Sequence, residues 1–115
     1  MQYHGSCHCG NIQFDVEGEL KHATACNCSI CQRKGTLLWF VGADQVKLLT
    51  PREKITTYTF NKKVIQHQFC PVCGVETFGE GKDPSGNAVF AINIRCLEGI
   101  DPLAVPSDLY DGKAI

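Results

Sequence analysis

The sequence has no long apolar run and no long helical repeat. Hydrophobic residues make up 43% of its 115 positions, but they occur in short stretches, well below the roughly 18 successive apolar residues that a membrane-spanning helix requires. No window longer than about 10 residues has the apolar spacing and end signals of an amphipathic helix. We therefore expect short helices at most, and no membrane partner.

An excess of charge of one sign is also missing. Eleven basic and twelve acidic residues give a net charge of −1, whereas a surface that binds nucleic acid or anionic lipid needs a concentration of Lys and Arg. We therefore expect no nucleic-acid partner. The first seven residues have neither the charged nor the apolar region of a secretory signal. This predicts a cytoplasmic protein, in which thiols stay reduced.

Strand signals dominate the rest of the chain. Period-2 alternation or β-branched and aromatic residues mark strands at 11–16, 20–25, 37–41, 54–60, 64–69 and 88–94. Residues 61–63 are typical of a hairpin turn, residues 80–87 of a surface loop, and residues 31–35 of one helical turn. From residue 98 onward we expect an irregular C-terminal tail. The length fits one domain, so the sequence predicts a single all-β domain over residues 1–115.

Seven of the eight cysteines form three groups. These are Cys7-His8-Cys9-Gly10, Cys26-Asn27-Cys28-Ser29-Ile30-Cys31 and Cys70-Pro71-Val72-Cys73-Gly74, while Cys96 stands apart. Residues two apart in an extended segment point to the same side, and a C-P-x-C-G turn is typical of a zinc knuckle, shaped by its proline and glycine. Structural zinc takes four ligands, often as two distant pairs. The spacing therefore predicts a closed structural site made by Cys7, Cys9, Cys70 and Cys73.

The middle group offers three thiols and no fourth. Three protein ligands with one exchangeable position are typical of catalytic rather than structural zinc, which makes Cys26, Cys28 and Cys31 the candidate catalytic site. Three thiolates on Zn²⁺ carry a net charge of −1. Such an ion activates carbonyls poorly and is better suited to binding a substrate thiol as its thiolate.

Other assignments of the cysteines remain open at this stage. Cys96 can complete the middle site and close it, although its place after an apolar strand is more typical of a buried thiol. Disulfides would require an oxidising compartment, and an iron-sulfur cluster is less favoured than zinc by the paired motifs. His8 is expected to point away from a metal held by its neighbours. His67 is expected to be a core residue that shares a strand face with Ile65 and Phe69.

The cysteine motifs, together with Asn-Ile-Arg-Cys-Leu-Glu-Gly around Cys96, resemble the glutathione-dependent formaldehyde-activating (GFA) enzymes from Gly5 to about Gly112. The resemblance implies a β-tent fold and a carbon-sulfur lyase of the S-(hydroxymethyl)glutathione synthase type. It also implies two zinc ions per chain, one structural in the four-cysteine site and one catalytic in the three-cysteine site.

The hypothesis that follows is that a small thiol such as glutathione binds the second zinc and adds to formaldehyde or a similar small aldehyde. Candidates for steering the carboxylates of the thiol are Arg33, Lys34 and Arg95, and candidates for lining the pocket are Trp39 and Phe40. The alternative is a non-catalytic zinc module that binds a protein partner.

Overall fold

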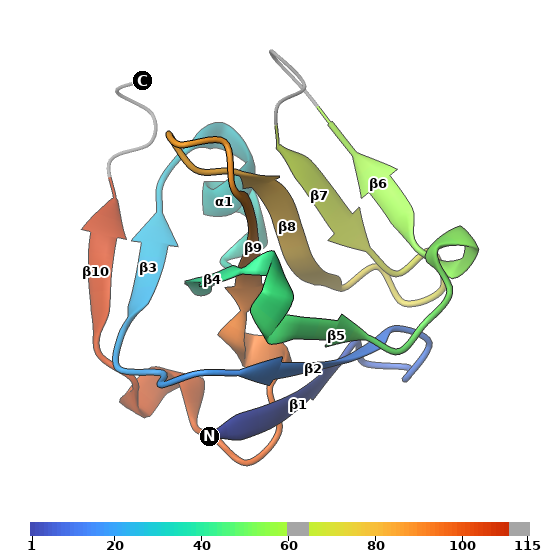
Figure 1. The fold of residues 1–115 in the computed structure, drawn as a ribbon, viewed down its shortest axis with the longest axis horizontal. Helices are drawn as coiled ribbons and strands as arrows, with labels where there is room; N and C mark the ends of the chain where they lie inside the picture. The colour runs from blue at the N-terminus through green and yellow to red at the C-terminus, as the bar shows by residue number, and fades with distance from the viewer. Residues whose placement is uncertain (60–64, 111–115) are drawn as a thin grey trace.

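The computed structural model describes residues 1–59 and 65–110, and strands dominate this part of the chain. They form two sheets, one of three strands in the order β1-β2-β5 and one of seven in the order β10-β3-β4-β9-β8-β7-β6. In Figure 1 the large sheet extends from β10 on the left to β6 on the right, with the small sheet across the bottom and α1 near the top. The all-β prediction is confirmed. Within the described residues, no helix has the length and apolar character needed to cross a membrane.

The small sheet consists of β1 (Gln2–Ser6), β2 (Gln13–Glu17) and β5 (Val46–Leu48). The large sheet consists of β10 (Ser107–Tyr110), β3 (Ala23–Cys26), β4 (Leu38–Gly42), β9 (Ala88–Asn93), β8 (Glu76–Lys82), β7 (Gln66–Phe69) and β6 (Thr56–Tyr58). The helix α1 spans Ser29–Lys34, and short 3₁₀ turns span Ala43–Gln45, Arg52–Lys54, Ile94–Cys96 and Pro102–Ala104. Neighbouring strands are antiparallel except for β10 and β3, which are parallel.

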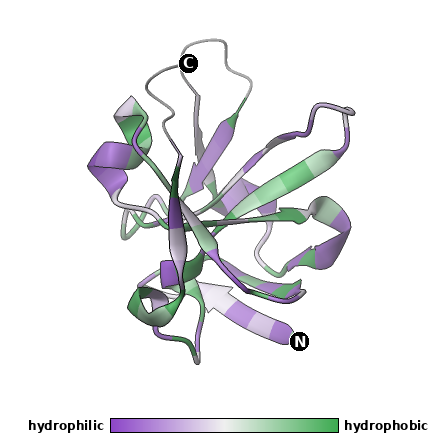
Figure 2. Cartoon of the chain, turned by 90° about the vertical axis from the view of Figure 1, so that its left-hand side faces the viewer, coloured by the Kyte–Doolittle hydropathy of each residue, from purple (hydrophilic) through white to green (hydrophobic). Residues whose placement is uncertain are grey.

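Aromatic side chains join the two sheets. Phe14 of β2 meets Phe78 of β8 edge to face with ring centroids 5.8 Å apart, and Phe78 stacks on Phe90 at 5.0 Å. Tyr3 of β1 meets Trp39 of β4 in the same edge-to-face manner at 5.7 Å. Such pairs add to the stabilisation from burying their apolar surface. Figure 2 shows hydrophobic and hydrophilic residues alternating along the strands, with hydrophobic segments crossing the middle of the molecule.

Each strand expected from the sequence overlaps an observed strand, and the β6–β7 hairpin is present, although its expected turn at 61–63 lies outside the described residues. The loop expected at 80–87 begins later, because residues 80–82 continue β8 between β7 and β9. The expectation of a fully irregular tail is wrong, because residues 107–110 form β10. All four of its residues are exposed, so β10 has no hydrophobic alternation that sequence patterns can detect.

A close approach between β1 and the core makes Gly5 indispensable. A Cβ atom built at Gly5 would lie 2.3 Å from Cζ of Phe14, a fully buried ring that cannot move aside. We predict that Gly5→Ala lowers the free energy of unfolding by about 2–3 kcal/mol, in the range for overpacked cores. The control is Gly79→Ala, whose added Cβ meets nothing nearer than 3.6 Å. Equal stability of the two variants in urea titrations would contradict this packing.

The small sheet carries a pH-dependent pair. His4 Nδ1 donates to Asp15 Oδ1 at 2.8 Å, and this hydrogen bond raises the pKa of His4 above its usual value. Because the folded pKa is raised, the pair stabilises the fold below about pH 6.5 and ceases to do so as pH rises through the higher folded pKa. Both side chains are partly exposed, which limits the contribution to about 0.5 kcal/mol.

We predict that His4→Gln lowers the free energy of unfolding at pH 6 and leaves it nearly unchanged at pH 8.5. Urea unfolding of wild type and variant at both pH values measures the difference. The matched control is His22→Gln, because His22 is mostly exposed and lies 3.8 Å from Asp108. A loss at pH 8.5 as large as the loss at pH 6 would show that the charge of His4 plays no part.

Candidate metal centres

The loop after β1 presents two thiols. Cys7 N–H donates to Ile12 O at 3.1 Å and Gly10 N–H donates to Cys7 O at 3.2 Å, which closes a tight turn. Gly10 has a φ of 85°, a left-handed conformation that glycine adopts without steric cost. Ile12 N–H also donates to Cys7 Sγ at 3.3 Å. The turn therefore directs the Cys7 and Cys9 sulfurs to one side, where they lie 3.7 Å apart.

The turn between β7 and β8 resembles the turn after β1, because a backbone hydrogen bond and a glycine of positive φ also close it. Gly74 N–H donates to Cys70 O at 2.8 Å, and Gly74 has a φ of 81°. Val72 N–H and Cys73 N–H both donate to Cys70 Sγ, at 3.3 and 3.4 Å. Although burial opposes ionisation, these backbone groups lower the pKa of Cys70 to about 6. Cys70 is therefore prepared to be a thiolate at neutral pH.

The two turns meet, as Figure 1 shows at the ends of β1 and β7, and bring the thiols of Cys7, Cys9, Cys70 and Cys73 within 4.8 Å of one another. Cys9 Sγ lies 3.7 Å from Cys7 Sγ and 3.6 Å from Cys70 Sγ. A tetrahedron with metal–sulfur bonds of about 2.3 Å has edges of about 3.8 Å, whereas a disulfide would place two sulfurs about 2.05 Å apart. All eight cysteines are free. The spacing fits a metal ion and not a disulfide.

The second cluster lies where β3 passes into α1. Cys26 ends β3, Cys28 precedes the first turn of α1, and Cys31 lies within that turn. Their thiols lie within 4.8 Å of one another. Cys28 N–H donates to Cys26 Sγ at 3.4 Å, and Gly35, with a φ of 67°, ends the helix by donating its N–H to Cys31 O. The end of β3 and the first turn of α1 therefore supply the three thiols.

Ionisation of the three thiols is unequal. Burial disfavours the Cys28 thiolate, but the backbone of Cys31 and the neighbouring thiols lower its pKa. Burial, together with Cys28 and Cys26, raises the pKa of Cys31. Neighbouring thiols whose ionisation depends on one another release protons when a cation binds to them. A group of three cysteines that are all partly buried can hold a metal ion and leave one face of it accessible.

Cys96 does not belong to the second cluster in this structure. Within the described residues, the group of ligand atoms around Cys26, Cys28 and Cys31 contains no further Cys, His, Asp or Glu. The Cys96 thiol instead donates to Glu76 O at 3.7 Å, and burial with the charges of Cys7 and Cys73 raises its pKa to about 12. His8 is exposed and outside both groups, as expected.

Sequence analysis missed Glu76. Its side chain is buried at the start of β8, where Oε1 lies 3.3 Å from His67 Nδ1 and also accepts from Lys34 Nζ. Burial would raise the pKa of Glu76, but hydrogen bonds from His67 and Lys34 outweigh it and lower the pKa. His67 is buried, as expected. A single glutamate after a cysteine knuckle carries no sequence signal, because its two partners come from distant segments.

The residues proposed to contact substrate have different surroundings. Trp39 is 9% exposed and belongs to the core, whereas Phe40 is 57% exposed. Lys34 is paired with Glu76 and its ammonium lies 5.9 Å from the centre of the Phe69 ring. Arg33 Nη1 donates to Ser29 O within α1, and Arg95 is exposed. The ammonium of Lys34 is therefore already paired with a carboxylate of the protein itself.

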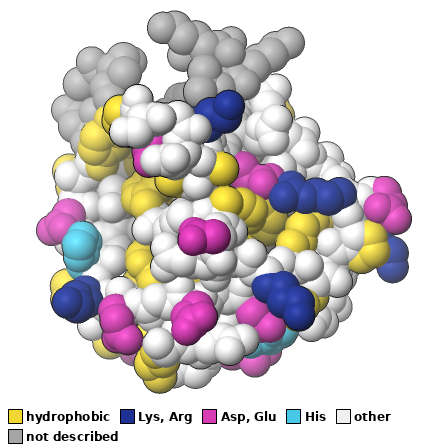
Figure 3. Space-filling model, viewed as in Figure 1, with side chains coloured by type: hydrophobic (Ala, Val, Ile, Leu, Met, Phe, Trp, Pro, Cys, Tyr) yellow, Lys and Arg dark blue, Asp and Glu magenta, His cyan; other side chains and the backbone are white. Residues whose placement is uncertain are grey.

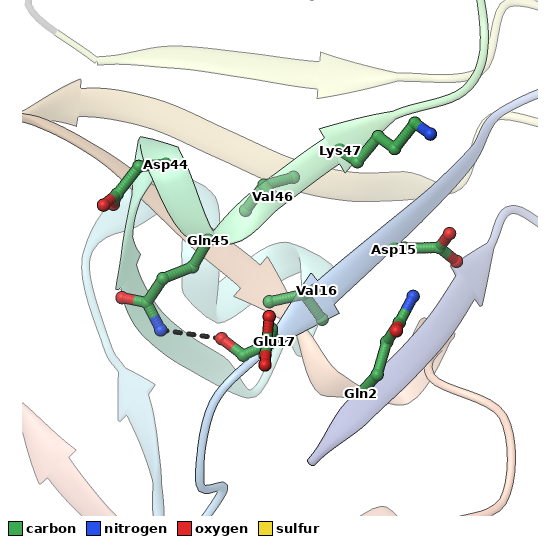
Figure 4. Close-up of a pocket in the computed structure, with 8 residues that line it drawn as sticks. All are labelled: Gln2, Asp15, Val16, Glu17, Asp44, Gln45, Val46 and Lys47. Carbon is green, nitrogen blue, oxygen red and sulfur yellow. Dashed lines mark hydrogen bonds between the residues drawn. The ribbon is translucent and has the colours of Figure 1, made fainter.

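Acidic and basic side chains are interspersed on the face shown in Figure 3. A cavity of about 220 Å³ lies against the small sheet, and Figure 4 shows Gln45 Nε2 donating to Glu17 O beside it. Its lining consists of Gln2, Asp15, Val16, Glu17, Asp44, Gln45, Val46 and Lys47. Because none of these is a cysteine, this cavity is not the place where thiol chemistry would occur.

Known proteins resemble both the sequence and the fold. The family model described as glutathione-dependent formaldehyde-activating enzyme matches residues 2–110. Curated relatives that carry this family's name occur in Talaromyces marneffei, at 34% identity over 79 residues, and in Colletotrichum graminicola, at 33% over 84 residues. These alignments cover 64% and 68% of this chain but only 42% and 44% of the relatives.

A crystal structure of a Rhodobacter sphaeroides protein superposes with a TM-score of 0.78 at 30% identity, covering 94% of this chain and 100% of that one. The chain thus spans less than half the length of the curated relatives but the whole of this solved structure. Because the family model covers nearly every residue that the structure describes, the chain belongs to the glutathione-dependent formaldehyde-activating family.

Proposed function

We propose that each cysteine cluster binds one zinc ion and that the two ions have different roles. Cys7, Cys9, Cys70 and Cys73 form a closed structural site, while Cys26, Cys28 and Cys31 form an open catalytic site. On this basis the protein is a zinc-dependent carbon-sulfur lyase that joins a small thiol to formaldehyde or a similar small aldehyde. The free cysteines fit a cytoplasmic protein, and we further propose that residues 1–115 act as one domain.

The difference in ligand number between the two clusters carries this proposal. One group brings four sulfurs together and the other brings three. Zinc in proteins is almost always four-coordinate, so a three-ligand site leaves a position for water or substrate. Cys26 and Cys28 are only partly buried, which leaves room for a fourth ligand from solvent.

The chain's own residues set the chemistry at the open site. A zinc ion held by the three cysteines would lower the pKa of a substrate thiol that binds to it. Cys26, Cys28 and Cys31 would supply three of the ion's ligands, and the Cys28 N–H, which donates to Cys26 Sγ, would offset part of their negative charge. The substrate sulfur supplies the electron pair of the new C–S bond, and the aldehyde oxygen takes up a proton.

Glutathione and formaldehyde are the substrates we propose, on the strength of family membership and of the names of the two relatives. The proposed binding of a substrate thiol by the three-cysteine site supports the addition of a thiol to an aldehyde as the class of reaction. The particular thiol is a proposal for this chain, because it spans less than half of those relatives.

We predict different consequences from breaking the two clusters. Cys73→Ser should lower the free energy of unfolding by several kcal/mol, because a structural metal is bound only by the folded chain. Cys28→Ser should retain the fold and one tightly bound zinc. Elemental analysis and thermal unfolding of both variants measure this, and equal melting of the two would contradict the division of roles.

We predict that a small thiol binds the open site directly. With cobalt at that site, adding glutathione should strengthen the thiolate-to-metal charge-transfer absorption, since a fourth sulfur joins the ion. Wild-type protein should also form the formaldehyde adduct faster than Cys28→Ser at equal concentration, a comparison that removes the uncatalysed reaction. If no thiol changes the spectrum and wild type is no faster, the protein-binding zinc module becomes the better interpretation.

A further inference from the structure

Helix α1 carries Cys31 but has little to hold it in place. It has six residues, none of them buried, and isolated helices shorter than about 12 residues are marginal in water. Its N-cap residue, Cys28, makes no side-chain capping hydrogen bond. Something beyond the helix itself must keep Cys31 beside Cys26 and Cys28.

Lys34, in the last turn of α1, makes the connection to the sheet. Its ammonium pairs with the carboxylate of Glu76 and lies 5.9 Å from the centre of the Phe69 ring. The Glu76 side chain is 7% exposed and that of Lys34 is 28% exposed, so the pair is largely shielded from water and from salt. An ion pair in this setting holds its geometry better than one on the surface.

Glu76 is itself fixed on both sides. It begins β8, three residues after Cys73, and pairs in register with Phe69 of β7, the residue before Cys70. His67 Nδ1 lies 3.3 Å from its Oε1, and the Asn93 side chain donates to its carbonyl at 2.9 Å. The four-cysteine turn and strand β9 therefore determine where the carboxylate lies.

We propose that Glu76 is a positioning residue for the three-cysteine cluster: through Lys34 it holds α1 so that Cys31 meets Cys26 and Cys28. The inference rests on the proposed function in taking this cluster as a metal site. Glu76 also follows directly from the four-cysteine turn. The ordered turn of the first site is thus connected to the helix of the second, and metal binding at one favours metal binding at the other.

The test uses the full chain with zinc retained in the four-cysteine site and titrates the other site with Co²⁺ against a competing chelator. Glu76→Gln and Lys34→Met should each weaken cobalt binding by about 10-fold, the lower end of effects seen for residues that orient metal ligands. The double variant should be little weaker than either single variant, because both remove one interaction. The control Arg33→Met removes a neighbouring cation that donates to Ser29 O of its own helix and should change the cobalt affinity less than twofold.

A second readout does not depend on the second metal. The amides of Gln32 and Gly35 donate to Cys28 O and Cys31 O within α1. In protein with only the four-cysteine site filled, these amides should exchange with deuterium faster in Glu76→Gln and Lys34→Met than in wild type. Amides of β9 should keep their protection, which separates a loosened helix from a loosened fold.

Unchanged cobalt affinity and unchanged exchange of the α1 amides in both variants would overturn the inference. Lys34 lies at the surface end of the pair, so Lys34→Met keeps the test decisive if Glu76→Gln does not fold. If wild type binds no cobalt at the second site, the proposed function fails, and the exchange of the α1 amides still decides whether Glu76 holds the helix.

Discussion

The convergence of four thiols from two distant turns is the constraint on which the rest of the structure depends. Cys9 and Cys70 are 61 positions apart in the chain, and their sulfurs lie 3.6 Å apart. Closing a loop of this length loses conformational entropy, and four thiols held so closely repel one another once ionised. A metal ion bound by the four thiols would remove the repulsion and stabilise the closure, and would join the small sheet to the β7–β8 hairpin.

The β7–β8 hairpin also helps to position the second cluster. β8 begins at Glu76, just after the four-cysteine turn, and Glu76 receives Lys34 from α1. The aromatic contacts between Phe14 and Phe78 tie the same strand to the small sheet. The second cluster therefore combines local geometry, from strand end to helix start, with a shielded ion pair to the start of β8. Such an arrangement would let the proposed site exchange a ligand without disturbing the fold.

The spacing of the cysteines predicted which of them group together. Residues in C-x-C, C-x-x-C and C-P-x-C-G motifs are close in the chain, so local backbone geometry brings their thiols together. The strands with alternating or β-branched residues were equally accessible, as Phe14 and Val16 illustrate on β2. Strand β10 was not, because its four residues are exposed and it is identified by its backbone pairing with β3. Glu76 was missed for a related reason: its importance depends on His67 and Lys34, which no local pattern places beside it. An apolar run does not show which of its faces is buried, so the sequence could not separate the buried Trp39 from the exposed Phe40.

The central claim is that one cluster is closed and the other open, and cadmium-113 NMR of protein loaded with two cadmium ions tests it most directly. The chemical shift of the nucleus reports the number of bound sulfurs. The account predicts two resonances, one in the four-sulfur range and one in the three-sulfur range, and only the second should move to the four-sulfur range when glutathione is added. Two four-sulfur resonances before any thiol is present would contradict it.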